Sequence, residues 1–190
     1  MNPISIGFAM CGSFCTFSKA LPQMELLAEQ GASIVPIMSE NAYTTDTRFG
    51  TAQSFINRIE KISGREIIHT ISQAEPIGPK KMCDLLIVAP CTGNTLSKLC
   101  NAITDTAVTM AVKSHLRVGR PVLLTLATND GLGASAQNLG RIINIKNIFL
   151  TPFSQDDPIN KPNSIVAHFE LIPECAELAL KYKQMQPVIR

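Results

Sequence analysis

The 190-residue chain has no tryptophan, and aromatic residues make up only 5% of it. These few aromatic side chains are scattered, so the sequence offers no platform on which nucleic-acid bases could stack. The formal net charge is only +2, and the longest basic run is Lys80-Lys81. A nucleic-acid-binding surface normally needs a denser cluster of lysine and arginine. We therefore predict that nucleic acid is not a partner.

Long hydrophobic runs are also missing. No stretch of about eighteen consecutive apolar residues occurs, so no membrane span is predicted. Residues 1–7 lack the basic start and apolar core of a signal peptide and are typical of a strand that begins almost at once. We therefore expect a cytoplasmic protein without a membrane partner.

The chain also lacks the cysteine patterns of zinc sites. None of the six cysteines forms a C-x-x-C pair, and no histidine pair with metal-ligand spacing accompanies them. We predict no metal site, and reduced thiols rather than a disulfide framework. The six are Cys11, Cys15, Cys83, Cys91, Cys100 and Cys175.

The composition that remains is that of an ordinary globular protein, with 45% hydrophobic and 17% charged residues. The length suits a single domain covering residues 1–190. Hydrophobic periodicity predicts strands at 4–9, 32–38, 66–69, 84–89, 122–127 and 147–150. It predicts helices at 18–30, 52–62, 94–101, 107–118, 134–143 and 164–182, the last kinked or restarted at Pro173, with loops at 39–46, 70–82 and 151–162. This alternation predicts an α/β fold: a three-layer, doubly wound, mostly parallel Rossmann-like sheet.

The most informative segment is the apolar run 85–89, which leads through Pro90 into small polar residues. A continuous apolar run is typical of a strand buried on both faces, and ligands bind beyond the carboxyl ends of such strands. Polar turns also follow three other predicted strands, at Gly12-Ser13, Ser39 and Thr128-Asn129. Gathered on one edge, the four turns would form a pocket for a mononucleotide phosphate with a flat ring beside it. The alternative is that loops are polar by default and the turns share no ligand.

Two common nucleotide motifs are absent from the first turn. Gly7 and Gly12 are too far apart for the dinucleotide fingerprint G-x-G-x-x-G. Ser13-Phe14 replaces the lysine and hydroxyl residue that would complete a P-loop. We therefore expect no nicotinamide dinucleotide site of the usual kind in this chain.

Three motifs resemble those of flavin-mononucleotide proteins, a family that includes phosphopantothenoylcysteine and peptidyl-cysteine decarboxylases. They are Cys11-Gly12-Ser13, the stretch 90–95 (Pro-Cys-Thr-Gly-Asn-Thr) and the stretch 126–129 (Leu-Ala-Thr-Asn). The resemblance implies that FMN is the cofactor. It also implies, as one possible activity, FMN-dependent decarboxylation of a cysteine-containing substrate. It also implies that Asn94 and Asn129 face the substrate. The cofactor-binding residues it implies are Gly12, Ser13, Phe14, Ser39, Thr92, Gly93, Asn94, Thr95 and Ala127.

Further stretches resemble one branch of this family, whose members work as one component of a two-component oxidoreductase: 44–50, 74–79 and 161–164. This resemblance implies oxidation of a small dihydropyridine dicarboxylate during spore formation. It also implies a partner protein that carries or shares NADP, and a homo-oligomer. Pro76 stands where the decarboxylases carry an active-site histidine, which disfavours thiol decarboxylation. A non-catalytic scaffold with a vestigial nucleotide pocket is the other alternative.

Five further side chains carry hypotheses of their own. Arg48 could grip a substrate carboxylate with two parallel hydrogen bonds, or be a solvated residue at a helix start. Asp105 is favoured as a helix cap. Cys91 could pack on a ring, whereas a nucleophilic role would need a nearby base that the sequence does not show. Asp130 could polarise a bound water or a substrate proton, but solvation in the loop is favoured, and His69 is expected to be a core residue. No catalytic acid or base is assigned.

Overall fold

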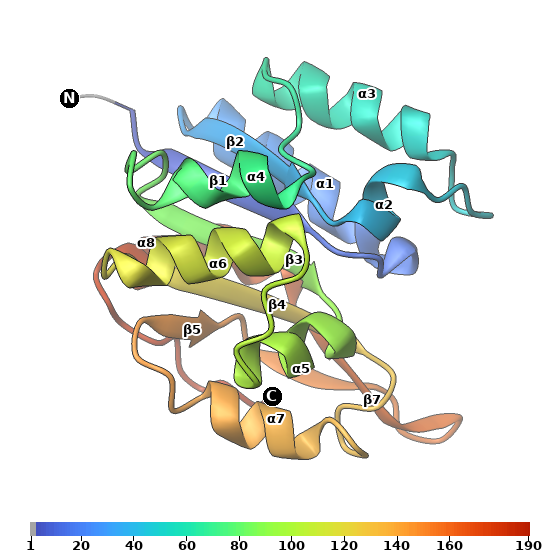
Figure 1. The fold of residues 1–190 in the computed structure, drawn as a ribbon. Helices are drawn as coiled ribbons and strands as arrows, with labels where there is room; N and C mark the ends of the chain where they lie inside the picture. The colour runs from blue at the N-terminus through green and yellow to red at the C-terminus, as the bar shows by residue number, and fades with distance from the viewer. Residues whose placement is uncertain (1–2) are drawn as a thin grey trace.

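A computed structural model describes residues 3–190; Met1 and Asn2, part of the predicted domain, lie outside them. Its centre is a parallel sheet in the order β2-β1-β3-β4-β5, and an antiparallel hairpin is added beside β4 (Figure 1). The predicted three-layer, mostly parallel α/β fold is confirmed. The strands are β1 (Ser5–Met10), β2 (Ser33–Met38), β3 (Leu85–Cys91), β4 (Val122–Thr128), β5 (Ile148–Leu150), β6 (Phe153–Asp157) and β7 (Lys161–Ala167).

Helices cover both faces of the sheet. In Figure 1, α6 crosses in front of the sheet and α1 lies behind it. On the α1 side lie α1 (Phe17–Glu29), α3 (Ala52–Ser63) and α8 (Ile172–Leu180), and on the α6 side lie α5 (Gly93–Cys100), α6 (Ala107–Arg117) and α7 (Ala136–Ile142). The short helices are α2 (Glu40–Thr44), α4 (Ile71–Ala74), η1 (Phe14–Thr16), η2 (Glu75–Ile77) and η3 (Phe169–Leu171).

The strand β3 joins the two halves of the core. All seven of its residues are buried. Successive side chains of a strand point to opposite faces, so Leu85 and Ile87 pack with the α1 layer while Leu86 and Val88 pack with the α6 layer. The continuous apolar run is therefore explained by a strand covered on both sides.

Side-chain caps fix several helix starts. Thr51 caps α3, which ends at Gly64 in the left-handed conformation (φ 64°). Helix α6 begins with a capping box in which Thr106 and Thr109 bond reciprocally. Asp105 was the favoured cap, but its carboxylate instead pairs with Lys98 at 2.8 Å.

The predicted strand 66–69 is wrong as a strand. Only an isolated bridge joins Ile37 and Ile68, in which the Ile68 amide donates to the Pro36 carbonyl at 3.0 Å and the Met38 amide donates to the Ile68 carbonyl at 2.9 Å. The loop expected at 70–82 also contains α4 and η2. Thr70 starts α4 with a capping box, so local hydrogen bonding rather than apolar periodicity produces this turn of helix.

The region after residue 150 departs most from the prediction. The expected loop 151–162 contains β6, and β7 occupies the end of that loop and the first residues of the expected helix 164–182. Asp157 pairs with Lys161 and Gln155 with Ile165, and the register shifts between these pairs. Pro162 falls in this irregular stretch, where no ladder amide is needed. The helix itself begins later, with Pro173 in the first turn of α8.

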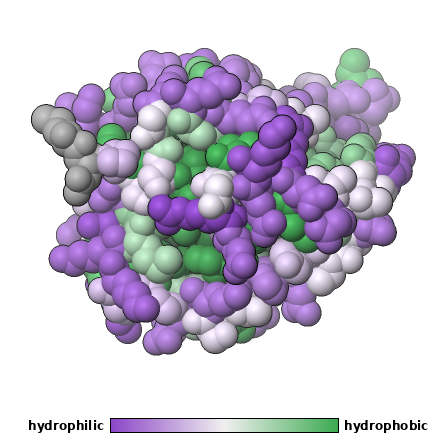
Figure 2. Space-filling model, turned by 90° about the horizontal axis from the view of Figure 1, so that it is seen from above, coloured by the Kyte–Doolittle hydropathy of each residue, from purple (hydrophilic) through white to green (hydrophobic). Residues whose placement is uncertain are grey.

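The surface is mostly polar on the face seen from above. Figure 2 shows hydrophobic side chains there in patches between hydrophilic ones. Among the helices of residues 3–190, none combines the length and the apolar character needed to cross a membrane.

His115 is buried in α6, and its Nε2 lies 3.1 Å from the Pro121 carbonyl oxygen. Burial and, to a smaller extent, the nearby Arg120 lower the pKa of this imidazole from 6.5 to about 4. Between these two values the unfolded chain binds a proton that the folded chain does not. The contribution of neutral His115 to stability is therefore fully present above the unfolded pKa of 6.5 and is lost as the pH falls toward about 4.

We predict that the free energy of unfolding falls by about 2 kcal/mol between about pH 7.5 and about pH 5 because of His115 alone. Urea unfolding of the wild type and of His115→Gln at both pH values measures this contribution. The variant should lose that part of the pH dependence. An equal change in the free energy of unfolding between the two pH values in both proteins would contradict the prediction.

Candidate functional site

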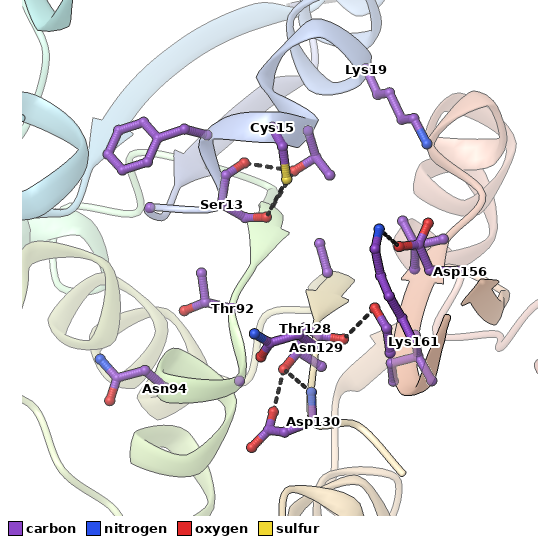
Figure 3. A pocket seen from close by; sticks show the side chains of 18 of the residues that line it. Ser13, Cys15, Lys19, Thr92, Asn94, Thr128, Asn129, Asp130, Asp156 and Lys161 are labelled. Carbon is purple, nitrogen blue, oxygen red and sulfur yellow. Dashed lines mark hydrogen bonds and ion pairs between the residues drawn. The ribbon is translucent and has the colours of Figure 1, made fainter. Parts of the chain in front are cut away.

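A cleft of about 850 Å³ opens at the carboxyl ends of β1, β3 and β4, and β7 forms its opposite wall (Figure 3). In a sheet of order 2-1-3-4-5, neighbouring crossovers diverge between β1 and β3, where ligands of this fold class bind. Most of the residues expected to bind cofactor or substrate line this cleft: Gly12, Ser13, Phe14, Thr92, Gly93, Asn94, Ala127 and Asn129. Their roles toward a ligand stay predictions.

The first turn presents Ser13 to the cleft. The Cys11 amide donates to the Pro90 carbonyl at 3.2 Å, which ties this turn to the end of β3. The Ser13 carbonyl accepts from the Thr16 amide and hydroxyl, and these bonds start η1. The Ser13 hydroxyl caps no helix amide; its partners are the Thr16 hydroxyl, at 3.2 Å, and the Cys15 sulfur, at 3.9 Å. Because sulfur is a weak acceptor, the Ser13 proton can be donated to a ligand.

The second turn starts α5. Thr92 caps this helix, because its Oγ1 accepts from the Thr95 amide at 3.2 Å. The amides of the first helical turn have no partner within the helix and carry its positive end, so Gly93 and Asn94 suit an anion. Thr95 does not line the cleft. It is buried beneath it and donates to the Cys11 sulfur at 3.2 Å.

Gly93 allows two loops to approach closely. A Cβ added there would lie 2.5 Å from the Thr128 hydroxyl and 2.8 Å from a carboxylate oxygen of Asp130. Asp130 was expected to be solvated, but it accepts hydrogen bonds from Thr128 and from the Ser135 hydroxyl. The carboxylate therefore ties the loop after β4 to the start of α7, and Gly93 lets the start of α5 pack closely against this loop.

Two further predicted residues lie outside the cleft lining. Ser39 is nearly buried and caps α2, where its Oγ accepts from the Ala42 amide at 3.4 Å. Arg48 is exposed in a tight turn, with its guanidinium 4.9 Å from the centre of the Phe49 ring. Of this pair only Phe49 reaches the cleft.

The thiols divide into buried and exposed groups. Cys91 is completely buried below the cleft, and burial raises its pKa well above the ordinary value. Burial also raises the pKa of the Cys11 thiol to about 11. Neither sulfur is a thiolate at neutral pH, so neither is a ready nucleophile. Cys15, by contrast, is exposed in the cleft.

Histidines are absent from the described residues that line this cleft. His69 was expected in the core, but it lies in a second cavity of about 830 Å³, stacked on Tyr43 with ring centres 3.9 Å apart. His168 lies 3.2 Å from Glu170, and Pro76 is half-buried in η2. Across residues 3–190, no group of three or more His, Cys, Asp or Glu side chains is placed to hold a metal ion.

The donors in the cleft fit a phosphate-bearing mononucleotide. The Ser13 hydroxyl and the amides at the start of α5 supply hydrogen bonds suited to a phosphate, whereas the Thr92 hydroxyl already donates to Thr95. Phe14, Ala127 and Val166 supply apolar contacts suited to a flat ring. The residues present therefore fit a group of the size and chemistry of FMN.

Several lining residues were missed from the sequence. They come from η1, α1, the turn at 47–50, the loop after β4 and the hairpin, and are Cys15, Thr16, Lys19, Phe49, Asp130, Asp156, Lys161, Ser164, Ile165 and Val166. The hairpin residues were hidden by the prediction of a loop and a helix there. The resemblance carried by the stretch 161–164 was the signal that could have found them.

Comparison with known proteins gives a consistent result. A family model described as Flavoprotein matches residues 1–171. The chain is 47% identical over 184 residues to the B subunit of dipicolinate synthase from Bacillus subtilis (strain 168), and the match covers 97% of this chain and 92% of that protein.

Solved structures agree with the sequence matches. A crystal structure of the B subunit of dipicolinate synthase from Bacillus halodurans has a TM-score of 0.90 and 45% identity, covering 100% of this chain and 98% of the other. The FMN-dependent cysteine decarboxylase SpaF has a TM-score of 0.66 and 18% identity, covering 95% and 97%. The second likeness is one of fold.

The contacts of Gly93 lead to a stability prediction. Gly93→Ala should destabilise the chain by about 1–3 kcal/mol, because its methyl group would displace Thr128 and Asp130. Gly12→Ala is the matched control, since its added carbon would lie no closer than 3.5 Å, to the Phe14 ring. Urea unfolding of both variants measures the difference, and equal stability would contradict the close approach.

Proposed function

Because the chain belongs to the flavoprotein family, we propose that it binds FMN and works as the B subunit of a dipicolinate synthase. Such an enzyme oxidises dihydrodipicolinate to dipicolinate, and spore formation is the proposed setting. The observation that carries the proposal is 47% identity to the B subunit of a dipicolinate synthase along nearly the whole chain. The cleft supports it, because its donors and apolar walls suit a mononucleotide.

The cofactor is assigned to the side of the cleft formed by β1 and β3. Ser13, Thr92 and the first amides of α5 would hold the phosphate and ribityl groups, and Ala127 would lie against the ring. When bound, FMN supplies a flat ring that can accept a hydride. Asn94 and Asn129, which also line the cleft, are assigned to the substrate.

The reaction removes a hydride and a proton from a dihydropyridine and leaves an aromatic ring. We assign the final oxidant, NADP, to the partner protein or to a site shared with it, because this chain has no dinucleotide fingerprint. The proposed partners are the A subunit of dipicolinate synthase and further copies of this chain. This chain contributes orientation of the substrate, and its cleft offers no histidine as a proton acceptor among the residues described.

A first prediction tests the cofactor. FMN should raise the melting temperature of the purified chain and give it flavin absorbance near about 450 nm. Ser13→Ala should weaken FMN binding about tenfold through loss of a hydrogen bond to a charged group. Ser18→Ala is the control, since Ser18 is exposed and outside the cleft lining. Colourless protein without a thermal shift would favour the scaffold alternative.

A second prediction tests the reaction. Co-expressed with the A subunit, the chain should support oxidation of dihydrodipicolinate coupled to reduction of NADP. Asn129→Ala should lower kcat/KM about tenfold without changing FMN affinity, because it removes a hydrogen bond to the substrate alone. Asn144→Ala, outside the cleft lining, is the control. Carbon dioxide release from a cysteinyl peptide would instead support the decarboxylase alternative.

A further inference from the structure

Two lysines face each other across the mouth of the cleft, and neither was among the predicted site residues. Lys19 comes from α1 and Lys161 from β7, and Figure 3 shows their side chains pointing toward one another. We propose that these two ammonium groups bind the two carboxylates of the substrate, one each. This assignment rests on the proposed function and names the residues that select a dicarboxylate.

Among the described residues that line the cleft, these two lysines are the only cationic side chains. The other charged lining residues are Asp130 and Asp156. Arg48, the residue expected to grip a carboxylate, lies over the Phe49 ring and outside the lining. The cationic groups available to a dianion in this cleft are therefore lysine ammonium groups and not an arginine guanidinium.

The two acidic residues act differently. Asp130 already accepts hydrogen bonds from Thr128 and Ser135. Asp156 pairs with Lys161 across the hairpin at 2.8 Å, with side chains 33% and 59% exposed. This pair holds the Lys161 ammonium in place while leaving two of its three donors for another anion. Within residues 3–190, Lys19 has no such ion pair.

The position of the lysines favours substrate over cofactor phosphate. In Figure 3 they lie on the opposite side of the cleft from Thr92 and Asn94, where the start of α5 offers amides to a phosphate. If the FMN phosphate lies near α5 and the flat flavin ring lies between the two sides of the cleft, the substrate carboxylates would lie toward the lysines. A ring with one carboxylate brings only one negative charge to the two ammonium groups.

Calorimetric titration of the purified chain tests this assignment. The probes are pyridine-2,6-dicarboxylate and pyridine-2-carboxylate. The dicarboxylate should bind at least about tenfold more tightly, and added salt should weaken its binding. Lys19→Met and Lys161→Met should each weaken dicarboxylate binding about tenfold and remove most of the preference over the monocarboxylate. Lys161→Arg should retain most of the affinity.

Two further variants sharpen the test. Asp156→Asn should strengthen dicarboxylate binding severalfold, because Lys161 no longer shares its charge with a neighbour. Lys113→Met removes an exposed lysine of α6 outside the cleft and should change nothing. Equal affinity for the two probes, or unchanged affinity in both lysine variants, would overturn the proposal.

FMN titration of the same variants separates this proposal from the proposed function. If both lysine variants lose FMN binding as strongly as dicarboxylate binding, the lysines serve the flavin phosphate and the assignment is overturned. If the wild type binds no FMN yet discriminates the two probes through the lysines, the cofactor assignment fails and the carboxylate assignment stands.

Discussion

The hydrogen bonding of three parallel strands, β1, β3 and β4, is the constraint on which the site depends. β3 lies between the other two and pairs with both. Because all three run in the same direction, the turns that follow them must emerge on one edge. The bond from the Cys11 amide to the Pro90 carbonyl extends this alignment beyond β1. The motifs after β1, β3 and β4 are far apart in the sequence, and the parallel pairing of these strands brings their turns together.

The far wall of the cleft follows from how β4 divides its partners. Its first half, 122–124, pairs with β5, which is only three residues long. Its last residues, Ala127 and Thr128, pair instead with β7, which runs antiparallel. A longer β5 would occupy that edge and leave no place for the hairpin. The short strand therefore allows a second group of side chains to face the motif-bearing turns.

Much of this architecture was readable from residue patterns, and the exceptions have identifiable physical causes. The run 85–89 and the turns at Gly12-Ser13 and 92–94 were recognisable, because burial on both faces and helix starts select particular residue types. The hairpin was not, since β7 is exposed at one end, carries a proline and reaches the main sheet only by pairing with the distant end of β4. Ser39 and Thr95 show another limit. Their hydroxyls satisfy backbone and thiol partners inside the fold, and sequence alone does not distinguish such a role from ligand binding.

The buried Thr95 hydroxyl has a consequence for how a ligand enters. It accepts a hydrogen bond from Thr92 and donates to Cys11, so it links the segments that follow two different strands. Those segments are consequently held at a set separation before any ligand arrives. A molecule that binds both would lose its own translational freedom, but would not also have to order the protein around it. Affinity at such a preorganised rim depends in part on a hydroxyl that lies outside the cleft lining.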